Sequence, residues 1–198
     1  MALESRFVQE VRKYEIMRDQ QIVVAGTTLY RVRALCDFGH VKAGSIGGYV
    51  RSESNLSQHG HCWIADDAQA YGEAVITDAA QVYGRARIYD RARICDRAQV
   101  LGNAEVFENG WVFKDGIVFD NAKVFGAAQV RDNGLAYGDS QIFDNVRVVN
   151  RGEVCGPARI GGRAVIDGHE SGNRPRPASG AATRNRRPRS PRGPRLRP

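Results

Sequence analysis

The chain has 198 residues, 42% of them apolar, so its length and composition suit one globular domain. No apolar run is long enough to cross a membrane and the first residues lack a signal-peptide stretch, so we expect a cytoplasmic protein. The net charge of +7 is uneven, because residues 169–198 hold nine arginines and one acid. That leaves 20 basic and 21 acidic residues over 1–168, a net charge of −1. The four cysteines have neither metal-ligand nor redox spacing, so we expect no metal and no cofactor.

Residues 1–42 predict a small β unit at the N-terminus, with a short helix within 1–13. The strand-like segments 21–24 and 29–35 flank an Ala-Gly-Thr-Thr sequence that is typical of a hairpin turn. Alternation along the second segment places three residues on one face: Tyr30, Val32 and Ala34. Because a stack of coils needs cover over its first strand edges, we interpret this unit as an N-terminal cap for the repeats that follow.

Residues 43–67 predict a first coil that leads into the repeats. Ile46 lies eighteen residues before Ile64, so we expect both side chains to point inward, with Ser52 and Gln58 at the inward places between them. We therefore expect the repeat domain to begin at residue 43 and to end at residue 168.

From residue 68 to residue 168 the chain repeats every six residues. The first place in each hexad is small, from Ala68 and Ala74 to Ala164, with Val146 the one large member. Two residues later the chain carries an aliphatic residue in most hexads, and two further on mostly Gly, Asp or Asn. A short strand followed by a corner, repeated three times, closes a triangular coil of eighteen residues. Seventeen hexads thus predict an all-β, parallel β-helix of between five and six coils, with the aliphatic residues inside.

The residues around the first coil carry a family resemblance. The segments Asp37–Val50 (DFGHVKAGSIGGYV) and Asn55–Ile64 (NLSQHGHCWI) resemble the opening of YdcK-like hexapeptide-repeat proteins, which are common in phages and prophages. The resemblance implies a left-handed parallel β-helix and a phage or prophage origin. Some of these proteins are labelled acetyltransferases by fold analogy, so the resemblance implies no established activity.

The residue after each inward aliphatic is expected to point outward, and positions eighteen apart stack into columns. Two columns are largely apolar: Tyr71, Tyr89, Phe107, Phe125 and Phe143 in the first, and Tyr83, Leu101, Phe119, Tyr137 and Cys155 in the second. A third column is mixed and contains Phe113, with Trp111 beside it. Such columns either stabilise the corners as ladders or form a subunit interface. We expect a homo-oligomer, and the resemblance implies a trimer.

Two neighbouring coils differ in the side chains that they present outward. One carries five arginines between Arg85 and Arg97, and the next carries Trp111 and several phenylalanines, a combination that suits single-stranded nucleic acid. Because Asp90 and Asp96 interleave with these arginines, we favour a solvated surface of mutually screened charges instead.

The candidate catalytic residues are few. An acyltransferase of the hexapeptide class needs a base, usually histidine, and no histidine occurs between residues 68 and 168. His59 and His61 are the candidates, and their alternative role is that of polar loop residues in the first coil. The uninterrupted hexads favour a non-catalytic structural or protein-interaction solenoid. An acyltransferase-like protein with a site near these histidines is the alternative.

The segment 169–198 predicts a disordered tail rich in Arg and Pro, since it has one large aliphatic residue and no aromatic. It suits either a basic arm that binds nucleic acid, the third functional hypothesis, or an out-of-frame end. The abrupt change of composition after the last hexad favours the second interpretation.

Overall fold

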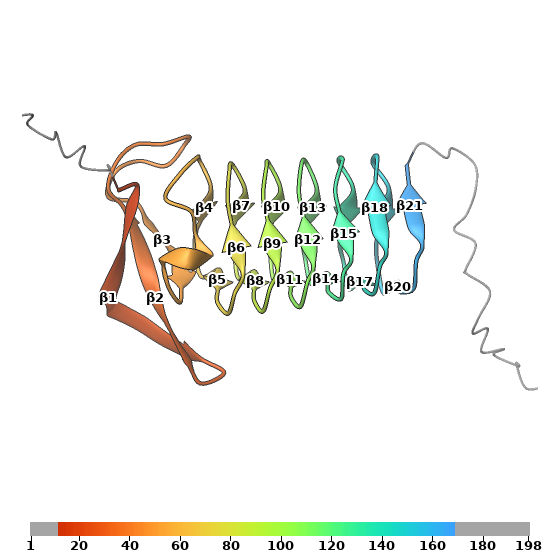
Figure 1. The fold of residues 1–198 in the computed structure, drawn as a ribbon, viewed down its shortest axis with the longest axis horizontal. Helices are drawn as coiled ribbons and strands as arrows, with labels where there is room; N and C mark the ends of the chain where they lie inside the picture. Colours follow the sequence, from red (N-terminus) through yellow and green to blue (C-terminus); the bar gives the residue numbers. More distant parts are fainter. Residues whose placement is uncertain (1–11, 169–198) are drawn as a thin grey trace, which may run out of the picture.

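The protein is a parallel β-solenoid with an antiparallel hairpin at its N-terminal end (Figure 1). The computed structural model describes residues 12–168. The tail predicted over 169–198 and most of the helix predicted within 1–13 therefore lie outside the described residues. The fold class expected from the hexads, an all-β parallel solenoid with a hairpin cap, is confirmed.

The hairpin consists of β1 (Tyr14–Val24) and β2 (Thr27–Ala34), joined by a two-residue turn. Ala25 and Gly26 both have positive φ, +47° and +76°, as such hairpin turns require. Strand β2 then pairs antiparallel with β3 (Ile46–Val50), and β3 pairs parallel with β5, so the cap extends one sheet of the solenoid.

The expected inner face of β2 is wrong at one position. Val32 and Ala34 are buried as predicted, but Leu29 is buried in place of Tyr30, which lies half-buried beneath the Arg18 guanidinium at 5.3 Å. Opposite this point β1 contains a bulge, since Met17 pairs with Arg31 and Gln21 pairs with Tyr30.

The first coil also differs from the predicted phase. Val50 and Leu56 fill its interior, whereas Ile46 is 45% exposed. Val50 pairs with Ala70 and Leu56 bridges Ile76, an offset of twenty residues instead of eighteen. Two extra residues in the loop before Trp63 account for the difference, and a single 3-10 turn, η1 (Glu53–Asn55), forms one corner of this coil.

From residue 63 onward the strands are short and regular, and they form the three walls of the solenoid. The nine-stranded sheet continues from β3 through β5, β8, β11, β14, β17 and β20, and two six-stranded sheets form the other walls. The strands are β4 (Trp63–Ile64), β5 (Gln69–Ala70), β6 (Val75–Ile76), β7 (Gln81–Val82), β8 (Arg87–Ile88), β9 (Arg93–Ile94), β10 (Gln99–Val100), β11 (Glu105–Val106), β12 (Trp111–Val112), β13 (Ile117–Val118), β14 (Lys123–Val124), β15 (Gln129–Val130), β16 (Leu135–Ala136), β17 (Gln141–Ile142), β18 (Arg147–Val149), β19 (Glu153–Val154), β20 (Arg159–Ile160) and β21 (Val165–Asp167).

The interior is built as the repeat predicted. Each parallel pair joins residues eighteen apart, so Val106 lies between Ile88 and Val124. The small residues and the aliphatic residues are buried in every coil before the last one. Each buried aliphatic contributes on the order of 1.5–3 kcal/mol, and the stacking repeats that contribution along the whole rod.

The corners carry a contact that the sequence reading missed. The predicted corner residues adopt positive φ, and most of the non-glycine ones are aspartates. Their carboxylates accept the backbone N–H of the corner residue one coil later, as Asp96 does from Lys114 at 2.9 Å. The same contact joins Asp66 to Gly84, Asp78 to Asp96, Asp90 to Glu108, Glu108 to Gly126, Asp120 to Gly138 and Asp144 to Gly162.

Substitution of Asp96 tests this corner contact. Asp96→Ala removes the acceptor and leaves an alanine at φ +56°, so we expect the free energy of unfolding to fall by about 1–2 kcal/mol. Asp96→Asn keeps an acceptor and tolerates this φ, so we expect a change within about 0.5 kcal/mol. Urea unfolding followed by circular dichroism measures both, and equal stability of the alanine variant would show that the contact contributes nothing.

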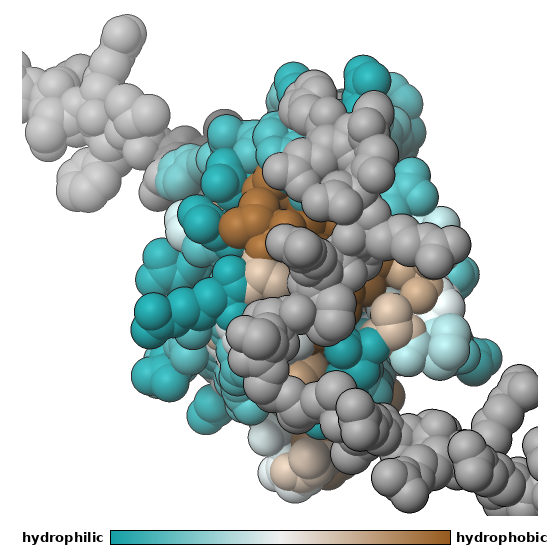
Figure 2. Space-filling model, turned by 90° about the vertical axis from the view of Figure 1, so that its right-hand side faces the viewer, coloured by the Kyte–Doolittle hydropathy of each residue, from teal (hydrophilic) through white to brown (hydrophobic). Residues whose placement is uncertain are grey.

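The last coil is less buried than those before it. Strands β19, β20 and β21 end the three sheets, and no described strand pairs with their outer edges. Ala158, Ile160, Ala164 and Ile166 are only half-buried, although their equivalents upstream are inaccessible. Figure 2 views this end of the rod and shows apolar surface bordered by polar side chains.

Candidate functional site

The first aromatic column forms a continuous ladder along the rod. Neighbouring ring centroids lie 4.8 to 5.2 Å apart and their planes differ by at most 11°, in the order Tyr71, Tyr89, Phe107, Phe125, Phe143. All five side chains are half-buried. Stacking at this separation stabilises successive corners. The ladder interpretation is confirmed for this column, and its use as an interface stays a prediction.

The other two columns contain shorter stacks. In the second column Phe119 and Tyr137 stack at 4.9 Å, and Leu101 and Cys155 occupy places where the first column has rings. The third wall is the sheet that contains β6, β9, β12, β15, β18 and β21. On this wall the indole of Trp111 stacks on Phe113 at 4.3 Å and donates a hydrogen bond to the Cys95 sulfur at 3.2 Å. The aromatic residues named as candidates thus lie on all three walls and do not converge on one point.

One acidic side chain on the wall beside the first ladder is almost fully buried. Glu105 is 9% exposed, and its carboxylate accepts hydrogen bonds from Arg87 at 2.5 Å and from the Tyr89 hydroxyl at 3.1 Å, with the Lys123 ammonium at 3.5 Å. Burial alone would raise the pKa of Glu105, but Arg87, Lys123 and Tyr89 together hold it below its usual value. The alternating charges at positions 87, 105 and 123, read eighteen apart, are the sequence signal that would have predicted this cluster.

The lowered pKa of Glu105 predicts a pH dependence of stability. A carboxyl whose folded pKa is depressed stabilises the fold above its unfolded pKa, about 4.3 for glutamate, and that contribution is lost as the pH falls through the folded pKa. We expect Glu105→Gln to be less stable than the parent at pH 7, and the difference in stability to be smaller at pH near 3. Urea unfolding at the two pH values measures this. The control is Glu73→Gln, an exposed glutamate, which should match the parent at both.

Two of the five arginines between Arg85 and Arg97 pair with acidic residues, but not with the aspartates that interleave with them in the chain. The carboxylates of Asp90 and Asp96 accept backbone N–H groups of the next coil and form no ion pair among the described residues. Arg87 pairs instead with Glu105, and Arg97 pairs with Asp115 at 2.8 Å. The position of these aspartates at the corners explains why they do not pair with the arginines, because their carboxylates point along the rod toward the backbone of the next coil. Arg91, Arg93 and Trp111 line part of an open groove of about 500 Å³ on the third wall.

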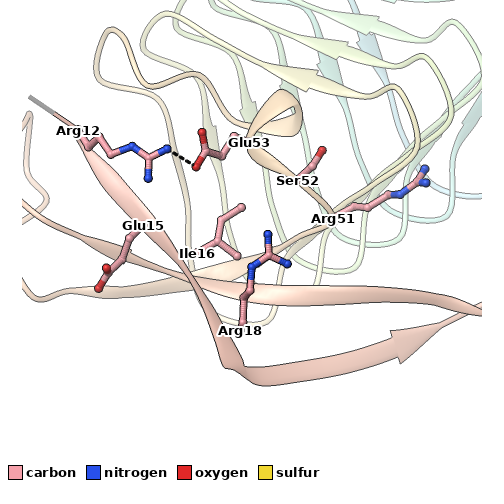
Figure 3. Close-up of a pocket in the computed structure, with 7 residues that line it drawn as sticks. All are labelled: Arg12, Glu15, Ile16, Arg18, Arg51, Ser52 and Glu53. Atoms are coloured by element: carbon pink, nitrogen blue, oxygen red, sulfur yellow. Dashed lines mark hydrogen bonds and ion pairs between the residues drawn. The ribbon is translucent and has the colours of Figure 1, made fainter. Parts of the chain in front are cut away.

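A second cleft lies between the hairpin and the first coil (Figure 3). It measures about 330 Å³. The acids that line it already have basic partners, because Glu53 pairs with Arg12 at 2.7 Å and Glu15 pairs with Arg33. The remaining lining residues are Ile16, Arg18, Arg51 and Ser52. No motif in the sequence pointed to this cleft, because its residues meet only through the hairpin fold.

The two candidate histidines lie apart from both clefts. His59 and His61 are exposed side chains on the loop before β4, and neither lines either cleft. The backbone carbonyl of His61 accepts a hydrogen bond from the Gln81 side chain at 2.9 Å, so the backbone of this loop contributes to the fold. The structure therefore brings these histidines to no enclosed site.

A buried lysine closes the N-terminal end of the coil stack and was missed by the sequence reading. Lys13 is 4% exposed, and its ammonium donates to the carbonyl of Cys62 at 3.0 Å and to its sulfur at 3.3 Å, with the Phe38 ring 5.0 Å away. Burial raises the pKa of the Cys62 thiol, and Lys13 opposes that shift. Between residues 12 and 168 no group of three or more metal-ligating side chains forms, and no helix is long and apolar enough to span a bilayer.

Comparisons with known proteins agree with the repeat. The YdcK β-solenoid repeat model matches residues 80–96. Escherichia coli (strain K12) YdcK, whose name describes it as an uncharacterized acetyltransferase, is 34% identical over 82 residues. That match covers 37% of this chain and 25% of YdcK, so the chain spans about a quarter of that relative's length. The chain is therefore a β-solenoid that contains a segment similar to the YdcK repeat.

Proposed function

We propose that the chain is a non-catalytic structural or interaction solenoid that associates with copies of itself through its outward aromatic columns. The observation that carries the proposal is the stacking of outward rings into columns along the rod, with five half-buried rings over four coil steps in the first ladder and the Phe119–Tyr137 stack in the second column. A row of rings about 20 Å long on a narrow rod is a contiguous apolar strip, and such strips on soluble proteins mark contacts with partners.

The regularity of the coils supports a non-catalytic role. Each hexad from 68 to 168 forms a two- or three-residue strand and a corner, and no inserted loop rises over a wall to shape a substrate site. A rigid rod with repeating walls suits a scaffold, because every wall offers the same spacing of side chains along its length.

The mass of the full chain in solution tests the proposal. We expect light scattering at micromolar concentration to give an oligomer for the parent, and a smaller species for Phe119→Thr combined with Tyr137→Thr in the second column. The control is Phe113→Thr on the third wall. Melting curves verify that each variant remains folded. A parent that stays monomeric up to hundreds of micromolar would overturn self-association.

Acyl transfer is the second candidate, and similarity to a relative named as an acetyltransferase favours it. In this alternative a site near His59 and His61 would be completed at a subunit boundary, with a histidine as the base that takes the proton from the acceptor. Calorimetric titration with acetyl-CoA distinguishes the two functions. Saturable binding that is lost in His61→Ala would favour the acyltransferase, and the absence of binding heat would rule out this function.

A further inference from the structure

The wall formed by β7, β10, β13 and β16 is free of charge on its outer surface. Over four successive coils its outward side chains are amide, aliphatic or aromatic, and all are half-buried: Gln81, Tyr83, Gln99, Leu101, Ile117, Phe119, Leu135 and Tyr137. We call this surface the uncharged face. It contains the second aromatic column together with the strand residues beside it.

The other two walls carry charge at the corresponding places. On one, the outward strand residues include Arg87, Glu105 and Lys123. On the other, Arg93 and Arg147 occupy strand positions, and further charges lie at the corners. Depletion of charge at the centre is the feature that separates protein interfaces from ordinary surface. By this criterion one wall of the three is suited to packing against another protein.

Polar groups border the uncharged face on both sides, and most of them are hydrogen-bonded within the chain, although the exposed Arg85 side chain has no partner among the described residues. Along one edge Arg97 pairs with Asp115 at 2.8 Å. Along the other edge the Asn103 amide donates to Asn121 at 3.1 Å, and Asn121 donates to Asp139 at 2.9 Å. An uncharged centre with a polar rim is the anatomy of a protein–protein interface.

We propose that the uncharged face binds the same face of a second copy of this chain, with the two rods side by side and parallel. This inference rests on the proposed self-association and names the wall that performs it. The same face is the fitting partner, because the surface has no charge for an acidic or basic partner to complement. A second copy leaves neither side with an unpaired charge in the contact.

The order of side chains along the face favours the parallel arrangement. Gln81 and Gln99 lie toward the cap, and Ile117 and Leu135 lie toward the other end. A two-fold axis along the rods places amide against amide and aliphatic against aliphatic. An antiparallel pair would place Gln81 opposite Leu135 and leave the amides against apolar groups, where they lose hydrogen bonds to water without replacement.

The size of the face sets the expected strength of the dimer. Four strands spaced about 4.8 Å apart and a wall about 16 Å wide give roughly 300 Å² per copy, against about 800 Å² per partner in standard interfaces. We therefore expect a reversible dimer that dissociates on dilution through the micromolar range.

A charge placed at the centre of the face tests the assignment. Ile117→Lys and Leu135→Lys, separately and combined, should make the full chain monomeric in light scattering over a dilution series, since two lysines would meet across the axis. Gln129→Lys is the matched control, because it adds the same side chain at a strand position of another wall and should leave the dimer intact. Circular dichroism melting verifies the fold of each variant.

Cysteine cross-linking tests the orientation. In a Cys155→Ser background, which removes the exposed native thiol, Leu135→Cys should form a dimeric disulfide with itself under mild oxidation. A cross-link that appears only when Gln81→Cys and Leu135→Cys chains are mixed would overturn the parallel arrangement. An oligomeric parent that remains oligomeric with both lysines would overturn the uncharged face as the interface and leave self-association standing. A monomeric parent would overturn both.

Discussion

Replacing Val106 with aspartate is expected to abolish the folded solenoid. Val106 is fully buried at the middle of the stack, between Ile88 above and Val124 below, and its neighbours offer only hydrocarbon. A carboxylate there has no partner, and burying it costs about 4 kcal/mol or more, a large part of the roughly 5–15 kcal/mol that stabilises a typical domain. We expect loss of the β-sheet circular dichroism signal, or a urea midpoint far below that of the parent.

The matched control for Val106→Asp places the same group outside. Ala127 is an exposed corner residue one coil later, so Ala127→Asp should change the free energy of unfolding by no more than about 0.5 kcal/mol. Equal melting of the two aspartate variants would contradict the inward assignment of the aliphatic places. The comparison is informative because a uniform stack has no spare element that could replace its middle coil.

The sequence predicted the repeats well because the hexad imposes one environment on each place. A buried small residue, a buried aliphatic and a corner at positive φ recur from Ala68 onward, and the pattern is strong enough to locate every strand from β5 to β21. It failed just before that point. Ile46 fits the period, but two extra residues in the loop before β4 shift the first coil, so Val50 and Leu56 face inward instead. Spacing alone does not reveal an insertion when an aliphatic residue happens to stand at the expected place.

The surface was harder to predict because its contacts run between coils. Asp90 and Asp96 lie next to arginines in the chain, yet their carboxylates bond to the backbone of the following coil. The arginine at position 87 reaches Glu105, which lies eighteen residues away in the chain and one coil away in space. Reading the chain in steps of eighteen recovers such contacts, whereas reading neighbours in sequence does not. The uncharged face emerges from the same columns once the strand residues are added to the corner residues.

The cap offers the second large effect, through a tyrosine whose role the sequence did not show. Tyr14 is fully buried at the start of β1, and its hydroxyl donates to the carbonyl of Leu56 at 2.5 Å. Its ring meets the edge of Trp63, with centroids 6.4 Å apart. The side chain therefore joins the hairpin to the first coil by both apolar packing and a hydrogen bond.

Tyr14→Ala is expected to lower the free energy of unfolding by about 3–5 kcal/mol, the usual cost of removing a buried aromatic ring. Tyr14→Phe keeps the ring and leaves one carbonyl unpaired, so about 1–2 kcal/mol is expected. Because each coil contacts only its neighbours, the damage should begin at the capped end. Hydrogen exchange should then accelerate over 46–64 in Tyr14→Ala while amides of β11 to β15 stay protected. Uniform acceleration along the rod would show instead that the cap and the coils unfold as a single unit, and that Tyr14 stabilises the whole stack.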